Sequence, residues 1–137
     1  MRAVFADTFY WVALTNPADS SYRDAGAFDD LLDSAWIVAK EEVLAEFLTF
    51  FAADPWLRKR AAETVRELLG DPDVRVVPQS HKSFLDGLDL YVARPDKGYS
   101  LTDCISMQAM RPDRITDALT NDRHFEQEGF RPLFRNS

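Results

Sequence analysis

Four acidic side chains stand where the sequence pattern predicts the edge of a sheet. Two of them follow short apolar runs that are typical of buried strands, one opens a helix, and one lies at the edge of a helix's apolar face. The carboxyl ends of parallel strands meet at one edge of a sheet, so we expect these side chains to converge there. The four acids are Asp7, Glu46, Asp103 and Asp122.

Converging carboxylates favour metal-ion chemistry. Like charges a few ångströms apart repel one another, and a divalent cation removes that repulsion. Oxygen ligands select hard ions such as Mg²⁺ or Mn²⁺, whereas the chain's two histidines and one cysteine are too few for a typical zinc cluster. An ion held in this way binds phosphate oxygens, activates water and stabilises a leaving oxygen. The pattern therefore favours hydrolysis of a phosphodiester bond.

Each acid alone also has a purely structural interpretation. Asp7, Asp103 and Asp122 all occupy places where a carboxylate caps a helix or faces its dipole. Glu46 is compatible with an ordinary solvated position at the edge of a helix. Only their joint occurrence at one end of a sheet favours a site.

Neighbouring residues are weaker candidates. Glu42, one turn before Glu46, is expected to lie further toward solvent, and Asp117 is a further acid close to the site in sequence. A histidine at a helix start, such as His124, is usually exposed, so we assign it no role. The supporting candidates are Thr8, Thr102 and Glu42.

The elements that must position these side chains alternate along the chain. Short buried strands are predicted at residues 3–6, 35–39, 74–77, 115–120 and 131–134. Helices begin after Asp54, Ser80 and Ser100, which are good caps, and Pro112 ends the last of these. Such alternation predicts an α/β fold with a parallel sheet covered on both faces.

Two amphipathic segments carry large apolar side chains. The helix after Ser80 is expected to turn Phe84, Leu85, Leu88 and Val92 inward. An aromatic cluster also exceeds what one small helix pair buries, so any exposed part of it marks a surface for a protein partner. This cluster consists of Phe47, Phe50, Phe51 and Trp56.

Composition limits the class of protein. The 137 residues, 46% of them hydrophobic, predict one domain spanning residues 1–137, and the single Cys104 excludes a disulfide framework within the chain. We find no basic leader and no apolar run of about 18 residues, so we expect a cytoplasmic protein without membrane association. The net charge of −7 argues against a protein that binds nucleic acid mainly by covering its phosphates with Lys and Arg side chains. Cations that flank the acids are Arg94, Lys97, Arg111, Arg114 and Arg123.

At the acidic segments the chain resembles the PIN-domain nucleases, and in particular the VapC-like toxins of bacterial toxin–antitoxin pairs. The matching segments, in order, are VFADTFYWVALTNPAD, EEVLAEFL, DKGYSLTDCISM and ALTNDRHFEQEGF, and they extend over nearly the whole chain. The family's four acids map to Asp7, Glu46, Asp103 and Asp122. One departure is Phe9, where many relatives have a small hydroxyl residue; Thr8 stands beside it.

This resemblance implies a three-layer sandwich with about five parallel strands and an Mg²⁺ or Mn²⁺ site. It also implies endoribonuclease activity on RNA that a cognate antitoxin restrains, and it is compatible with a homodimer. Two alternatives remain at this stage. One is a non-catalytic module of the same fold that binds RNA or protein, and the other is an aspartate-based phosphatase or receiver domain. The second fits poorly, because Phe9 replaces the acid expected two residues after Asp7.

Overall fold

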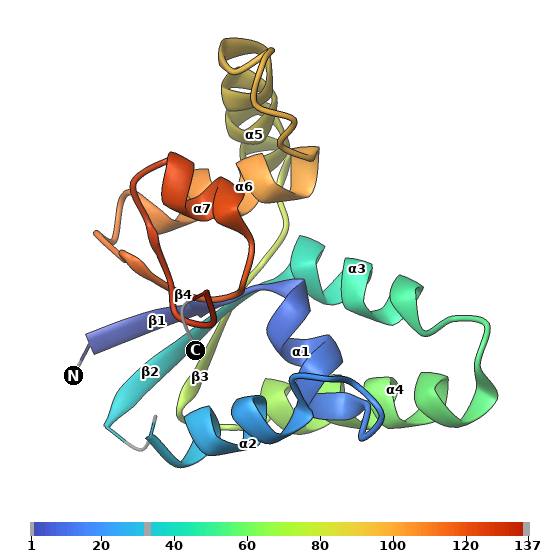
Figure 1. The fold of residues 1–137 in the computed structure, drawn as a ribbon. Helices are drawn as coiled ribbons and strands as arrows, with labels where there is room; N and C mark the ends of the chain where they lie inside the picture. Colours follow the sequence, from blue (N-terminus) through green and yellow to red (C-terminus); the bar gives the residue numbers. More distant parts are fainter. Residues whose placement is uncertain (1, 32–33, 136–137) are drawn as a thin grey trace.

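A parallel sheet runs through the centre of the molecule in the computed structural model, which describes residues 2–31 and 34–135 (Figure 1). Its strands are β1 (Arg2–Ala6), β2 (Ala35–Lys40), β3 (Val74–Val77), β4 (Asp117–Leu119) and β5 (Arg131–Pro132). Their order is β3-β2-β1-β4-β5, and every neighbouring pair is parallel. The predicted five-stranded parallel sheet is confirmed, with the first strand of the chain in the middle.

Helices cover both faces of this sheet. They are α1 (Thr8–Thr15), α2 (Tyr22–Leu31), α3 (Glu41–Phe50), α4 (Pro55–Leu69), α5 (His81–Ala93), α6 (Leu101–Met110) and α7 (Arg123–Gln127). The chain moves from β1 to β3 in one direction and then returns to β4 on the other side of β1. Right-handed crossovers therefore put α1 to α4 on one face and the later helices on the other, as Figure 1 shows.

Local signals placed the helix starts correctly. Asp54 accepts hydrogen bonds from the backbone N–H groups of Trp56 and Leu57, and Ser80 and Ser100 both form capping boxes. The predicted third strand coincides with β3.

The last two strands are shorter than predicted, because neighbouring backbone groups bond elsewhere. Ile115 N–H donates to Met110 O, and Thr120 N–H donates to Ala118 O, so neither N–H group bonds to a neighbouring strand. β5 retains two residues of the predicted 131–134.

The prediction for the apolar face of α5 is wrong. This helix packs mainly on α6, through Gly87 and Leu90, and a Cβ atom added to Gly87 would lie 2.4 Å from Ile105 Cγ1. Close contact with a single helix leaves the opposite side uncovered, so the four predicted core residues, Phe84, Leu85, Leu88 and Val92, are exposed. Together with the exposed Tyr91 they form what we call the outer face of α5.

The core lies between the central strands and the helix layers. Val4, Phe5 and Ala6 of β1 are fully buried, and Phe125 of α7 is buried with them. Cys104 is buried as expected of a small hydrophobe. None of the helices in the described ranges is long and apolar enough to cross a membrane. The core thus fixes β1, whose carboxyl end leads directly into Asp7.

Candidate metal centre

Asp7 lies at the centre of the site, one residue beyond the middle strand β1. Only 7% of the residue is exposed, and the Thr120 hydroxyl donates a hydrogen bond of 2.9 Å to its Oδ2 atom. Burial, followed by the negative charge of Asp103, raises the pKa of Asp7 to about 7, while the Thr120 hydrogen bond opposes the rise. A carboxylate in this position is therefore costly to ionise unless a cation accompanies it.

Glu46 reaches the same place from α3. The Thr8 hydroxyl donates a hydrogen bond of 2.5 Å to Glu46 Oε1, and Thr8 directly follows Asp7. The charge of Glu46 contributes to the raised pKa of Asp7. Although Glu46 as a whole residue is exposed, this hydrogen bond turns its carboxylate toward the end of β1.

Ligand atoms of Asp103 and Asp122 lie within 4.8 Å of each other, and each residue also caps a helix. Asp103 completes the capping box of α6, whereas Asp122 accepts a hydrogen bond of 2.9 Å from the backbone N–H of His124. Burial first, and then the charge of Asp122, raises the pKa of Asp103. The structural roles predicted for these two acids are therefore real, and they coexist with the mutual repulsion expected of a site.

His124 stands between the last two acids. Its Nδ1 atom lies 3.6 Å from Asp103 Oδ2 and 3.3 Å from Asp122 Oδ1. Ligand atoms from the three residues all lie within 4.8 Å of one another, a spacing at which one cation contacts all three. The expectation that His124 would be solvent-exposed is wrong, since only 23% of its side chain is exposed.

The donor set fits a hard divalent ion. Within residues 2–31 and 34–135, none of the four acids forms an ion pair with a lysine or an arginine. Most of the candidate ligand atoms are carboxylate oxygens. The single imidazole, from His124, is more compatible with Mn²⁺ than with an ion such as Mg²⁺ that takes oxygen ligands alone. Asp103 and Asp122 thus lie within coordination distance of each other, Asp7 interacts electrostatically with Asp103 and with Glu46, and His124 is the one basic side chain among the described residues that pairs with any of the four acids.

Glu42 does not face solvent as expected. Its side chain is 16% exposed, lies 3.0 Å from the Lys40 ammonium and accepts a hydrogen bond of 2.6 Å from the Ser83 hydroxyl. Burial alone would raise the pKa of Glu42, but the hydrogen bonds from Ser83 and Lys40 outweigh it and lower the pKa. This carboxylate is therefore neutralised by side chains of its own surroundings.

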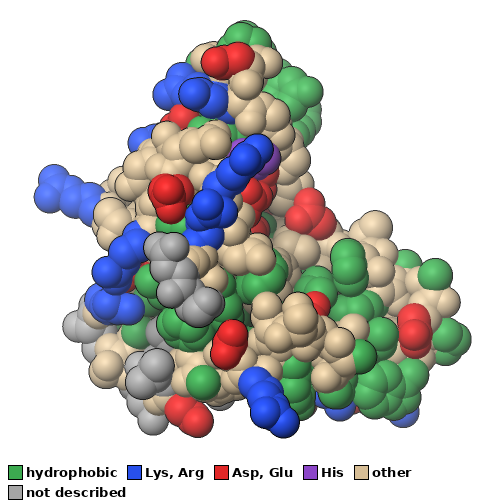
Figure 2. Space-filling view, viewed as in Figure 1, with side chains coloured by type: hydrophobic (Ala, Val, Ile, Leu, Met, Phe, Trp, Pro, Cys, Tyr) green, Lys and Arg blue, Asp and Glu red, His purple; other side chains and the backbone are tan. Residues whose placement is uncertain are grey.

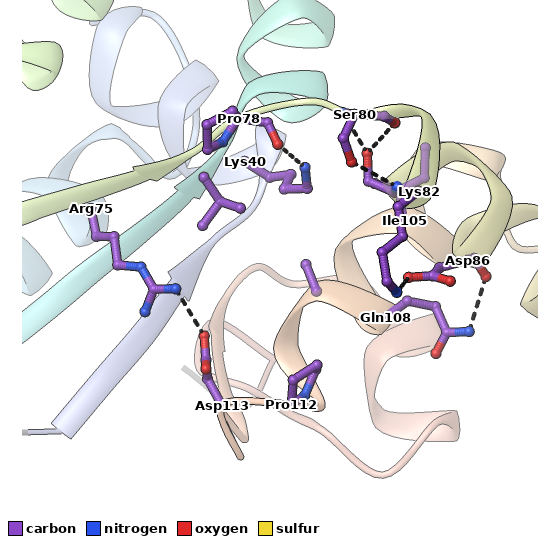
Figure 3. Close-up of a pocket in the computed structure, with 13 residues that line it drawn as sticks. Lys40, Arg75, Pro78, Ser80, Lys82, Asp86, Ile105, Gln108, Pro112 and Asp113 are labelled. Carbon is purple, nitrogen blue, oxygen red and sulfur yellow. Dashed lines mark hydrogen bonds and ion pairs between the residues drawn. The ribbon is translucent and has the colours of Figure 1, made fainter.

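A pocket opens beside the side chains of Lys40 and Ser83, which both contact Glu42 (Figure 3). Its volume is about 170 Å³, and none of the four acids lines it. The Lys40 ammonium donates to the carbonyl of Pro78, and the pocket's other cations form ion pairs across or beside it. These pairs, drawn in Figure 3, are Arg75 with Asp113 and Lys82 with Asp86.

Asp117 lies at the opposite end of the sheet from the acids. It is the first residue of β4, where Arg131 contacts it with two hydrogen bonds of 2.8 and 3.0 Å and Arg2 approaches to 3.3 Å. Its proximity in sequence was misleading, because β4 carries the chain across the sheet between Asp117 and Asp122. Thr102 remains beside Asp103 in the first turn of α6.

Thr120 was missed by the sequence interpretation. Its hydroxyl donates to Asp7 and accepts a hydrogen bond of 3.2 Å from the backbone N–H of Asp122, so it links two of the acids. The residue is fully buried. The signal available in the sequence was a hydroxyl residue at the end of a predicted strand, two positions before an acid.

Comparisons with known proteins identify the fold. No protein-family model matches the chain, and no curated protein matches it. Among solved structures, the crystal structure of Mycobacterium tuberculosis VapC20, a sarcin-ricin loop cleaving toxin, superposes with a TM-score of 0.83 at 24% identity. The match covers 93% of this chain and 95% of VapC20. This chain therefore has the fold of the VapC20 toxin, as its resemblance to VapC-like PIN domains predicted.

Proposed function

We propose that this protein is a Mg²⁺- or Mn²⁺-dependent endoribonuclease that hydrolyses RNA phosphodiester bonds, and that it is the toxin of a toxin–antitoxin pair. One observation carries the proposal: Asp7 interacts with the charges of Asp103 and Glu46, Asp103 interacts with that of Asp122, and none of the four has a lysine or arginine partner in the described ranges. The likeness to VapC20, which cleaves the sarcin-ricin loop, supports RNA as the substrate.

The four acids have distinct roles in this proposal. Asp7 and Asp103 are the main ligands, because their burial makes them the most dependent on a cation. Glu46 and Asp122 complete the site from α3 and from the start of α7. When bound, the ion supplies Lewis-acid stabilisation of the phosphate and activation of water. Thr120 holds the Asp7 carboxylate in position.

RNA phosphates need cationic contacts near the acids, and basic side chains are present there. Figure 2 shows Lys and Arg side chains next to the histidine and the carboxylates in the region of α6 and α7. Arg94 and Arg111 are both paired with Glu128, whereas Lys97 and Arg123 are exposed. We assign the phosphate contacts to Lys97 and Arg123.

The antitoxin surface is proposed to lie over α3 and α4. The aromatic cluster predicted from the sequence divides there: Phe47 and Phe51 are buried, whereas 64% of Phe50 and 57% of Trp56 are exposed. A groove of about 360 Å³ lies between the same helices, lined by Leu48, Thr49, Ala52, Arg58 and Ala62. An amphipathic antitoxin segment would place its apolar side chains in this groove.

A second copy of the chain is proposed to cover the outer face of α5. Five large apolar side chains at helical spacing, exposed by 38% to 68%, form one patch along the helix, and contiguous apolar patches mark protein–protein contacts. Light scattering on the purified protein should give the mass of a dimer, and Leu88→Glu should give that of a monomer. A wild-type monomer at micromolar concentration would rule out this assembly.

The experiment that tests the nuclease proposal compares acids from both ends of the sheet. Purified wild-type protein is incubated with total RNA and Mn²⁺, and the new RNA ends are sequenced. Asp7→Asn and Asp103→Asn should each lower cleavage by about a thousandfold, since each removes a charge that balances the ion. Asp117→Asn, the matched control, should cleave at the wild-type rate. Full activity in an Asp7→Asn, Asp103→Asn double variant would refute the proposal.

Calorimetry separates the enzyme from a non-catalytic module of the same fold. The proposal expects Mn²⁺ binding by the wild-type protein and its loss in Asp7→Asn. A protein that binds no Mn²⁺ at millimolar concentrations, yet still binds RNA, would favour the module.

A further inference from the structure

Glu128 is a buried carboxylate outside the acidic site. It follows α7 directly, and its side chain is only 6% exposed. Arg94 Nε donates to its Oε1 atom and Arg111 Nη2 to its Oε2 atom, both at 2.6 Å, and the Tyr99 hydroxyl donates to Oε1 at 3.3 Å. The two arginines cap the carboxyl ends of α5 and α6, so one carboxylate joins three separate segments of the chain.

Two short paths lead from Glu128 to the acids. Along the backbone, its N–H donates to His124 O at 3.2 Å, and the His124 N–H bonds to the side chain of Asp122. Through space, the Tyr99 ring that contacts Glu128 also packs on His124, with 5.2 Å between ring centroids. His124 in turn lies between Asp103 and Asp122.

The helix that carries Asp122 needs such an attachment. α7 has five residues, too few for a helix to be stable on its own, so tertiary contacts must fix its position. Phe125 anchors it to the core, and the Asp122 N–H donates to Thr120 at its start. Glu128 adds two charge-assisted hydrogen bonds of fixed direction.

We propose that Glu128 is a positioning residue that holds α7 against α5 and α6 and so sets the distance of Asp122 from Asp103. Its own oxygens are taken by the two arginines, so it contacts neither ion nor RNA. This inference rests on the proposed function, because the acids matter as ligands. The inference predicts that the affinity of the acidic site for a metal ion depends on Glu128, although Glu128 is not a ligand.

The test compares two buried carboxylates that each hold two arginines. Glu128→Gln removes the charge at α7, and Asp117→Asn removes the equivalent charge at the other end of the sheet. Mn²⁺ affinity is measured by calorimetry, and hydrogen exchange of residues 121–128 is measured in metal-free protein. Glu128→Gln should weaken Mn²⁺ binding about tenfold and accelerate that exchange, whereas Asp117→Asn should change neither by more than about twofold.

A milder variant guards against misfolding. Arg111→Gln leaves the Arg94 pair in place and should produce a smaller change of the same sign in both measurements. Unchanged exchange in Glu128→Gln, or an equal loss of Mn²⁺ affinity in Asp117→Asn, would overturn the inference while the proposed function stands. A wild-type protein that binds no Mn²⁺ would instead overturn the proposed function, and this inference with it.

Discussion

The two ends of the sheet treat buried carboxylates in opposite ways. At the amino end, Asp117 is met by Arg131 and Arg2, so its charge is balanced within the chain. At the carboxyl end, Asp7 is equally buried, but its surroundings add the negative charges of Asp103 and Glu46. The first arrangement stabilises a fold, and the second stores repulsion that an external cation would relieve.

This contrast separates acids that look alike in the sequence. Asp117 and Asp122 are five residues apart and both flank the same short strand. What distinguishes them is the pair of arginines beside Asp117: Arg131, 14 residues away in sequence, and Arg2, from the other end of the chain. An arginine partner indicates a structural acid, and the absence of one among the described residues indicates a candidate ligand.

The largest expected effect beyond catalysis is a pH-dependent instability of the metal-free protein. The pKa of Asp7 is raised from 3.8 to about 7, so the folded state retains a proton that the unfolded state has lost between these values. The part of the unfolding free energy that depends on Asp7 should therefore be highest below about pH 4, fall between pH 4 and 7, and stay low above pH 7. A rise of this size in the pKa of Asp7 lowers the free energy of unfolding by about 4 kcal/mol.

Urea unfolding from pH 5 to 8, with and without Mn²⁺, measures this effect. Mn²⁺ should restore stability at pH 8 in the wild-type protein, and Asp7→Asn should have a flatter pH profile. A wild-type stability that rises steadily from pH 5 to 8 in metal-free buffer would contradict the raised pKa.

Asparagine substitutions at the two ends should have opposite effects on stability. Asp7→Asn removes an ionised group from a buried, negative environment and should stabilise the metal-free protein at pH 8 by about 2 kcal/mol. Asp117→Asn weakens two hydrogen bonds from Arg131 and should lower the melting temperature by about 5 °C. Calorimetric melting of both variants at pH 8 tests these two predictions. A loss of stability in both variants would contradict the expected difference between the two ends of the sheet.

The smallest expected effect concerns Thr120. Its hydrogen bond lowers the pKa of Asp7 against the effect of burial, so Thr120→Val should raise that pKa further. The acidic limb of the cleavage profile should move to higher pH, because Asp7 must lose its proton to act. Thr120→Ser, which keeps the hydroxyl, is the control and should leave the profile in place.

Local chemistry explains what the sequence interpretation predicted well. Strand β3 and the caps Asp54, Ser80 and Ser100 depend on a few adjacent residues, and all were correct. The parallel sheet followed from the alternation of strands and helices, whereas its strand order was not predicted.

Non-local contacts account for what was missed. Thr120 is 113 residues from Asp7 in sequence, and Glu42 accepts a hydrogen bond from Ser83 at a separation of 41. Periodicity finds the apolar side of a helix but not which side has a neighbour, so α5 was turned the wrong way. His124 was taken as exposed because its cover, the ring of Tyr99, comes from the loop before α6.

The shortness of β5 has a consequence for assembly. An edge strand with free N–H and C=O groups invites another sheet to continue it. Here the outermost strand has two residues, and the second is Pro132, which has no N–H to offer; at the far edge, β3 runs directly into Pro78. The β5 margin is thus a poor template for strand addition, which favours the exposed helix faces for association of this molecule.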